Sequence, residues 1–280
     1  MKIIICEYNY ILHLRQLLYL IFKHFNINMF HTNRFLITFI FYILCTNCLS
    51  QKHKDSVTNF PTIRVSLALQ SAKGDFEQDF GLNSNIGVSL GWKNGKNKTF
   101  ELTYNFIHSS NVKNRSIVSH LLNDQGWIIN QYGEENLFLL YHRGGLLSLD
   151  FGKVFNRYGT NSNSGIFIRG GLGAMYHRIR IENQENLIPQ LSKQYLKYYD
   201  RLTAGIMLKQ YVGYQHMSKS RLVNFTIGME IIEGFNKGMR DYQIDLMGPY
   251  LDQKRDIYLG IRAEWIFPVL RKNPKEFYYN

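Results

Sequence analysis

The chain has 280 residues, enough for one domain or for a β-barrel with loops. It contains 19 Tyr and 19 Phe but only 5 Pro, and charged residues make up 19% of it. Many aromatic residues with few charges favour strands over helices. The formal net charge is +12, but no zinc-finger spacing, RNA-binding signature or run of five basic residues accompanies it, so we expect no nucleic-acid partner.

Cysteine and histidine patterns give no sign of a bound group. All three cysteines, Cys6, Cys45 and Cys48, precede residue 50, so the rest of the chain has no disulfide framework and no cysteine metal site. There is no His-x-x-x-His motif and no ligand set with metal spacing. We predict no cofactor and no metal.

The N-terminal part has the layout of an export signal. Residues 35–44 form an apolar run directly after Arg34, and Cys48 and Ser50 supply small residues at the −3 and −1 positions of a cleavage site. The run is shorter than the roughly 20 residues that a membrane-spanning helix needs. We therefore predict a signal peptide over 1–50, which would expose the mature chain to an oxidising compartment.

Beyond residue 51, apolar and polar residues alternate with a period of two in runs of about ten residues, the length of a tilted membrane strand. The runs predict eight strands: 62–71, 85–93, 99–109, one within 136–155, 165–181, 202–215, 221–231 and 257–267. Gly144 and Gly145 interrupt the fourth run as a bulge or as a hairpin turn, so a barrel of ten strands is the alternative.

The connections alternate in length, which is typical of outer-membrane barrels with short periplasmic turns and long outer loops. Long polar connections are expected at 72–84, 110–135, 182–201 and 236–256, and short ones at 94–98, 156–164 and 216–220. The sequence therefore predicts an all-β fold, an eight-stranded antiparallel up-and-down transmembrane β-barrel preceded by a signal segment. A soluble sandwich or a ligand-binding barrel with its apolar residues inside is the main rival.

The face opposite the apolar residues is rich in glycine and carries four basic and four acidic side chains. These predicted lumen ion pairs are Arg64, Glu101, Asp150, Arg169, Lys209, Glu230, Arg262 and Glu264. Buried charges must be paired, so this balance suits a narrow, plugged lumen rather than an open pore. Trp92 and Trp265 fall at the short-turn ends of their strands, where an aromatic girdle would meet the membrane interface.

The last predicted strand, Tyr258 to Trp265 followed by Phe267, resembles the terminal recognition signal of outer-membrane barrels. This resemblance implies insertion by the barrel-assembly machinery. Together with Tyr199–Thr203 and the tail Arg271–Asn280, it resembles a group of uncharacterised outer-membrane β-barrel proteins of Bacteroidota, in the small OmpA/OmpX-like class. The group carries no activity that this chain would inherit.

These expectations define four regions of the chain. The signal peptide covers 1–50, with Met29 as the hypothesised true start, and a short periplasmic segment covers 51–61. The barrel covers 62–269 and a periplasmic tail covers 270–280. The protein would be exported to a bacterial outer membrane and contact its lipid.

The leading functional hypothesis is a non-enzymatic structural, surface-binding or envelope-interaction module. Its long loops, above all 110–135 and 236–256, would contact an envelope protein or a surface ligand. One alternative is a lipid-modifying enzyme that uses a rim histidine, His108 beside Ser109 or His177, but no catalytic triad is evident. A second alternative is a narrow solute channel.

Overall fold

The computed structural model describes residues 57, 59–183, 187–218 and 223–269. The predicted signal peptide, the hypothesised start at Met29, most of the segment 51–61 and the tail 270–280 lie outside these residues. In the part of the chain that is described, no helix is long and apolar enough to cross a bilayer.

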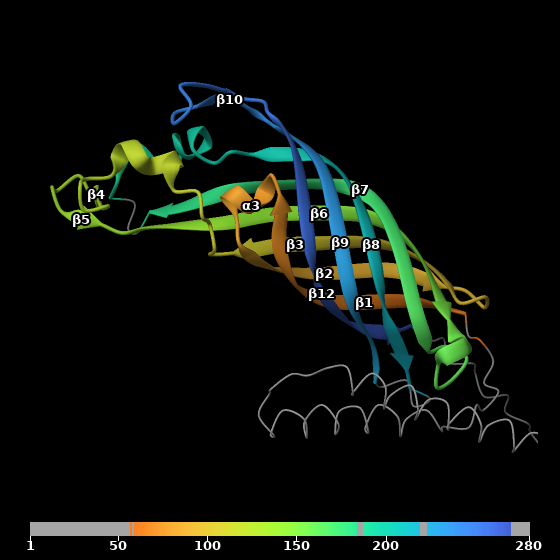
Figure 1. The fold of residues 1–280 in the computed structure, drawn as a ribbon. Coiled ribbons are helices and arrows are strands. Elements are labelled where there is room, and N and C mark those ends of the chain that lie inside the picture. The colour runs from red at the N-terminus through yellow and green to blue at the C-terminus, as the bar shows by residue number, and fades with distance from the viewer. Residues whose placement is uncertain (1–56, 58, 184–186, 219–222, 270–280) are drawn as a thin grey trace, which may run out of the picture. The chain divides into compact units, whose positions relative to one another are not determined.

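The described chain forms a closed barrel of eight antiparallel strands (Figure 1). Each strand pairs with the next large strand along the chain, and the last pairs with the first. The predicted all-β, eight-stranded, up-and-down barrel is therefore confirmed. The barrel strands are β1 (Phe60–Gly74), β2 (Leu82–Lys93), β3 (Lys98–Ser109), β6 (Phe138–Phe155), β7 (Gly165–Asn183), β8 (Thr203–Met217), β9 (Asn224–Gly238) and β12 (Gln253–Pro268).

The fourth predicted run is one continuous strand, so the ten-stranded alternative is wrong. β6 pairs with β7 without a break from Phe155 to Phe138, straight through Gly144 and Gly145. A Cβ atom at Gly145 would lie 2.7 Å from the ring of Tyr176 on β7. The glycine therefore makes room for a neighbouring ring within the sheet and does not form a turn.

The connections at one end of the barrel are short, and three at the other end are long and carry small elements (Figure 1). The prediction of a fourth long connection at 72–84 is wrong, because β1 continues to Gly74 and β2 begins at Leu82. The smaller elements are α3 (Phe76–Asp79), η2 (Ser116–Leu121), β4 (Ile128–Ile129), β5 (Glu135–Asn136), η3 (Asn156–Tyr158), η5 (Pro189–Leu191), η6 (Leu196–Tyr198), β10 (Arg240–Gln243) and β11 (Gly248–Tyr250).

The two faces of the barrel wall are inverted relative to a soluble protein. On β1, the outward Leu67 and Leu69 are 52% and 57% exposed, whereas the inward Arg64 and Gln70 are 1% and 0% exposed. The other barrel strands repeat this alternation over their middle parts. The rival in which the apolar residues point inward around a ligand is therefore wrong for this chain.

Candidate functional site: a charged interior and a folded outer end

The structure places all eight predicted lumen charges on the inner face of the barrel, and none is more than 3% exposed. We call this group the ionic layer: Arg64, Glu101, Asp150, Arg169, Lys209, Glu230, Arg262 and Glu264. They come from seven of the eight barrel strands, since only β2 contributes none. Charges from nearly the whole wall therefore meet in the interior of the barrel.

Two arginines and two glutamates of the ionic layer form a closed ring. Arg64 lies 2.8 Å from Glu101 and 3.3 Å from Glu264. Arg169 lies 2.9 Å from Glu101 and 2.5 Å from Glu264. Each carboxylate is shared by two guanidinium groups, and the four side chains come from β1, β3, β7 and β12, so the ring crosses the lumen. Such buried charges are stable only because each is paired.

Two further ion pairs extend the ionic layer toward the loop end. Lys209 Nζ lies 2.7 Å from Asp150, whose carboxylate also accepts a hydrogen bond from Thr103 Oγ1 at 2.7 Å. Arg262 donates from Nε and Nη2 to Glu230 at 2.6 and 2.7 Å.

Glycine leaves the space that these long side chains fill. A Cβ atom at Gly171, on the inner face of β7, would lie 2.0 Å from Asp150 Oδ1. The glycine residues of the inner face are therefore needed for the long charged side chains to pack inside the barrel.

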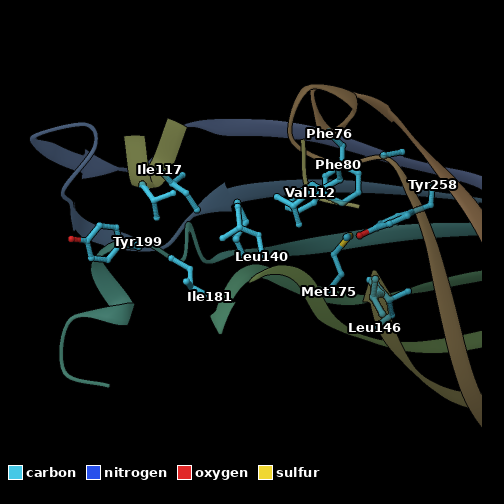
Figure 2. Close-up of a cluster of buried hydrophobic side chains, with 14 of the residues drawn as sticks. Phe76, Phe80, Val112, Ile117, Leu140, Leu146, Met175, Ile181, Tyr199 and Tyr258 are labelled. Atoms are coloured by element: carbon cyan, nitrogen blue, oxygen red, sulfur yellow. The ribbon is translucent and has the colours of Figure 1, made fainter. Parts of the chain in front are cut away.

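Toward the loop end, rings rather than ions fill the interior. The short helix α3 folds into the barrel mouth and brings Phe76 against Tyr258, and Phe80, directly after the helix, packs against Phe76 (Figure 2). The ring centroid of Phe76 lies 4.8 Å from Tyr258 and 4.9 Å from His177, and that of Phe80 lies 4.1 Å from His142. We call these five residues the aromatic plug.

The aromatic plug contains one buried histidine–carboxylate pair. His177 Nε2 lies 2.9 Å from Asp256 Oδ2, which also accepts a hydrogen bond from Asn236 at 2.5 Å. Among the residues that the structure describes, no hydroxyl group bonds to His177, and His142 makes no hydrogen bond through either ring nitrogen. The pair therefore resembles the histidine and acid of a catalytic triad, but no nucleophile accompanies it among the described residues.

His108 does not join this pair. It faces outward on β3, where it contacts Arg143, whereas His177 faces inward. The hydroxyl of Ser109, beside it, donates to the carbonyl of Leu82 at 2.6 Å. The barrel wall therefore separates the two rim histidines of the enzyme alternative, and they cannot act in one site.

The apolar core continues from the aromatic plug into the outer loops. Ile117 and Val118 of η2 are fully buried, and Figure 2 shows Ile117 and Tyr199 in the same cluster of buried side chains as Leu140. Burial raises the pKa of Tyr199. Arg240 binds Asp200 through two hydrogen bonds of 2.8 and 2.6 Å, and this contact raises the pKa of Arg240. The outer loops are thus folded parts of the protein.

The outward face carries aromatic side chains at two levels. Trp92 and Trp265, near the short-turn end, are 49% and 44% exposed, and they pair across strands with Phe100 and Phe225. Nearer the loops, Tyr104 and Phe106 on β3 and Tyr176 on β7 point outward on the two strands that flank β6, each between 42% and 48% exposed. We call these two sets the turn-side belt and the loop-side belt.

Sequence reasoning missed the aromatic plug. Phe76 and Phe80 stand four residues apart within 72–84, which the sequence presents as a polar loop because Asp75, Glu77 and Asp79 surround them. The spacing of four is the signal that one helical turn would place both rings on the same side. The connection has only seven residues, so it can bury this apolar side only in the barrel mouth.

No protein-family model and no curated protein matches the chain. The chain resembles solved structures of other barrels, among them Ail, the attachment invasion locus protein of Yersinia pestis, in complex with the heparin analogue sucrose octasulfate. That likeness has 10% identity, covers 75% of this chain and 99% of that one, and has a TM-score of 0.41.

Two more likenesses are similar in extent. The N-terminal β-barrel domain of Pseudomonas aeruginosa OprF has 12% identity, with 75% and 100% coverage and a TM-score of 0.35. A major outer membrane protein from Thermus thermophilus has 10% identity, with 74% and 99% coverage and a TM-score of 0.35. Likeness at this level carries no information about activity or ligand, and closure of the barrel follows from its own strand pairing.

Proposed function

We propose that this protein is a closed, non-conducting β-barrel of a bacterial outer membrane that presents its folded loops to a partner outside the cell. The observation that carries the proposal is a belt of exposed apolar side chains around an interior sealed by paired charges. A soluble monomer rarely exposes a contiguous apolar patch larger than a few hundred Å². Lipid is the solvent that suits such a surface.

The apolar belt has the height of a membrane. On β12, outward apolar residues run from Ile257 to Phe267. Ten steps of roughly 3.3 Å, on a strand tilted by about 40°, give a height of about 25 Å, which is the apolar height of known outer-membrane barrels. Trp265 of the turn-side belt lies near one edge of this height, and Tyr176 of the loop-side belt, ten residues after the outward Ile166 on β7, lies at the other, as interfacial rings do in membrane proteins.

The short turns would face the periplasm and the long loops the outside, as in other barrels of this kind. β1 begins and β12 ends at the short-turn end, since Phe60 pairs with Lys93 and Thr62 with Pro268. The architecture is that of the small OmpA/OmpX-like class. An origin in Bacteroidota and insertion by the barrel-assembly machinery remain predictions.

Two measurements test placement and sealing. We expect the protein in the membrane fraction, with a gel mobility that changes on heating because the folded barrel resists detergent. In planar bilayers we expect no stable single channels, since the ionic layer and the aromatic plug fill successive levels of the interior. A water-soluble protein after export would refute the placement, and stable large channels would refute the sealing.

The loops carry the contact function in this proposal. The hairpin of β4 and β5 stands farthest from the barrel in Figure 1 and exposes Trp127, Ile129 and Tyr132. Aromatic side chains on a folded support are typical anchors of protein interfaces. The absence of a nucleophile beside His177, among the described residues, gives no support to an enzyme.

Photocrosslinking can test the contact function with a matched control. Tyr132 in the hairpin and Tyr158 in the opposite short turn are 69% and 70% exposed. A photoreactive residue at position 132 should crosslink to an envelope protein or a surface polymer in intact cells, and one at position 158 should not give that product. Identical products from both positions, or none from position 132, would contradict a role for the hairpin.

A further inference from the structure

Basic side chains gather on the outward face of β6 and β7 directly above the loop-side belt. Arg178 and Arg180 point outward on β7, and Arg143 on β6 pairs across strands with Arg178. Tyr141 pairs with Arg180. Figure 1 shows β6 and β7 running on past the start of β8 toward the outer loops. The three arginines therefore share one patch of wall.

The level of this patch is set by the strand itself. Arg178 follows Tyr176 of the loop-side belt by two residues, which is the next outward position on β7. In a membrane barrel the positions just beyond an aromatic belt lie among lipid headgroups. The three guanidinium groups would therefore meet the polar layer of the outer leaflet.

The positive charge of the patch is only partly neutralised within the protein. Arg178 lies 3.8 Å from Asp200, but both oxygens of that carboxylate accept hydrogen bonds from Arg240. Arg143 contacts the ring nitrogen of His108 and lies over the ring of Tyr141, neither of which is an acid. In the described ranges, no carboxylate lies within ion-pair distance of Arg180, although Glu182 shares its face.

Beside the patch lies a groove of about 470 Å³ between the end of β7 and the segment that carries η5 and η6. Its charged lining comprises five basic residues, Arg178, Arg180, Lys193, Lys197 and Arg240, and two acidic residues, Glu182 and Asp200. Leu191 and Leu196 add apolar surface to the same lining. The groove therefore offers excess positive charge next to apolar side chains.

We propose that Arg143, Arg178 and Arg180, together with this groove, bind the phosphate of a lipid headgroup in the outer leaflet. Guanidinium groups bind phosphate oxygens in a bidentate manner, and arginine is less strongly hydrated than lysine, which favours this contact at a membrane interface. The inference rests on the proposed placement in a membrane. It assigns the patch a ligand of defined chemistry, a phosphate group carried on acyl chains.

The test compares the purified full chain with the double variant Arg143→Gln/Arg180→Gln. Each sample in detergent micelles is mixed with lipid A or with the same lipid freed of its phosphates, and bound lipid is counted by native mass spectrometry. Loss of two charge-assisted contacts should weaken binding of the phosphorylated lipid about tenfold or more. The wild type should bind the dephosphorylated lipid as weakly as the variant does.

A charge-matched control is available at the other end of the barrel. Lys96→Gln/Arg157→Gln removes two exposed basic residues beside the short turns and should leave lipid binding unchanged. Millimolar inorganic phosphate should not displace the lipid, and full displacement would instead assign the patch to free phosphate. Equal binding of both lipids by the wild type, or an equal loss in the control variant, would overturn the proposal.

The same samples separate this inference from the proposed function. A gel shift on heating, together with recovery in the membrane fraction, reports whether the barrel is folded and inserted. An inserted barrel with no preference for the phosphorylated lipid refutes the headgroup site alone. A chain that is not inserted refutes both.

Discussion

The two halves of the barrel interior are lined by the same eight strands but filled by different chemistry. The half near the short turns holds the ionic layer, in which every charge comes from a strand and meets an opposite charge from another strand. The half near the loops holds the aromatic plug, which is completed by Phe76 and Phe80 from outside the strands. The ionic layer is formed by the barrel strands alone, whereas the aromatic plug also needs the connection between β1 and β2.

The two halves of the interior should therefore differ in how well they tolerate substitutions. A charge in the ionic layer is buried, so the loss of its oppositely charged partner leaves it uncompensated in a medium of low dielectric constant. A ring in the aromatic plug contacts its neighbours by dispersion and shape, so its loss leaves a cavity but no stranded charge. The two halves should therefore respond differently to the loss of one side chain.

The largest effect is expected in the ionic layer. Glu264→Ala removes the carboxylate shared by Arg64 and Arg169 and should lower the free energy of unfolding by about 4 kcal/mol, because two buried guanidinium groups lose a partner. Denaturant titration of the barrel folded into lipid vesicles measures the loss. The control Glu77→Ala, which breaks an exposed pair with Lys73, should change little. Equal losses in both variants would show that the ring contributes nothing special.

A smaller effect is expected in the aromatic plug. Phe76→Ala should lower the free energy of unfolding by about 3 kcal/mol, since it deletes a buried ring and leaves a cavity against Tyr258 and His177. The double variant Phe76→Ala/Phe80→Ala should still show no stable channel in planar bilayers, because the ionic layer beneath it remains. Appearance of channels would mean that the plug, and not the ion pairs, seals the barrel.

The sequence predicted the strands and their faces because a period of two links position directly to side. Knowing that Arg64 and Leu67 lie on opposite faces requires only their spacing. The ends of the strands were harder to predict, because the outer parts of β1, β9 and β12 carry charged outward residues such as Lys73 and Arg255. There the alternation between apolar and polar residues fades while the backbone pairing continues.

Two features of the interior could not be predicted. The partner of each charge depends on the tilt and stagger of the strands around the barrel, and these bring Arg64 to Glu101, two strands away, and to Glu264, on the adjacent strand. The outer groove depends on how the segment with η5 and η6 folds back on β7, where Ile179 N donates to Asp200 O at 2.8 Å. Neither arrangement leaves a periodic trace in the sequence.

An intermediate effect is expected where the loops join the barrel. Arg240→Gln should lower stability by about 1.5 kcal/mol, because the bidentate contact with Asp200 is lost at a half-buried site. The raised pKa of Arg240 means that its contribution is fully present near neutral pH, below its ordinary pKa, and is lost only as the pH rises through the raised value. The difference between variant and wild type should therefore be constant from about pH 6 to about pH 10. A difference that vanishes within that window would contradict this role for the pair.

The smallest effect is optical and concerns the outer face of the two halves. The chain has three tryptophans, Trp92 and Trp265 in the turn-side belt and Trp127 beside the loop hairpin. In variants that keep one tryptophan each, lipids brominated near the headgroup should quench Trp92 and Trp265, whereas aqueous acrylamide should quench Trp127. The three rings are comparably exposed, at 49%, 44% and 37%, so exposure alone predicts equal aqueous quenching of all three. Only a lipid layer around the turn-side belt would make Trp92 and Trp265 less accessible to acrylamide than Trp127. Equal aqueous quenching of all three would mean that this belt faces water.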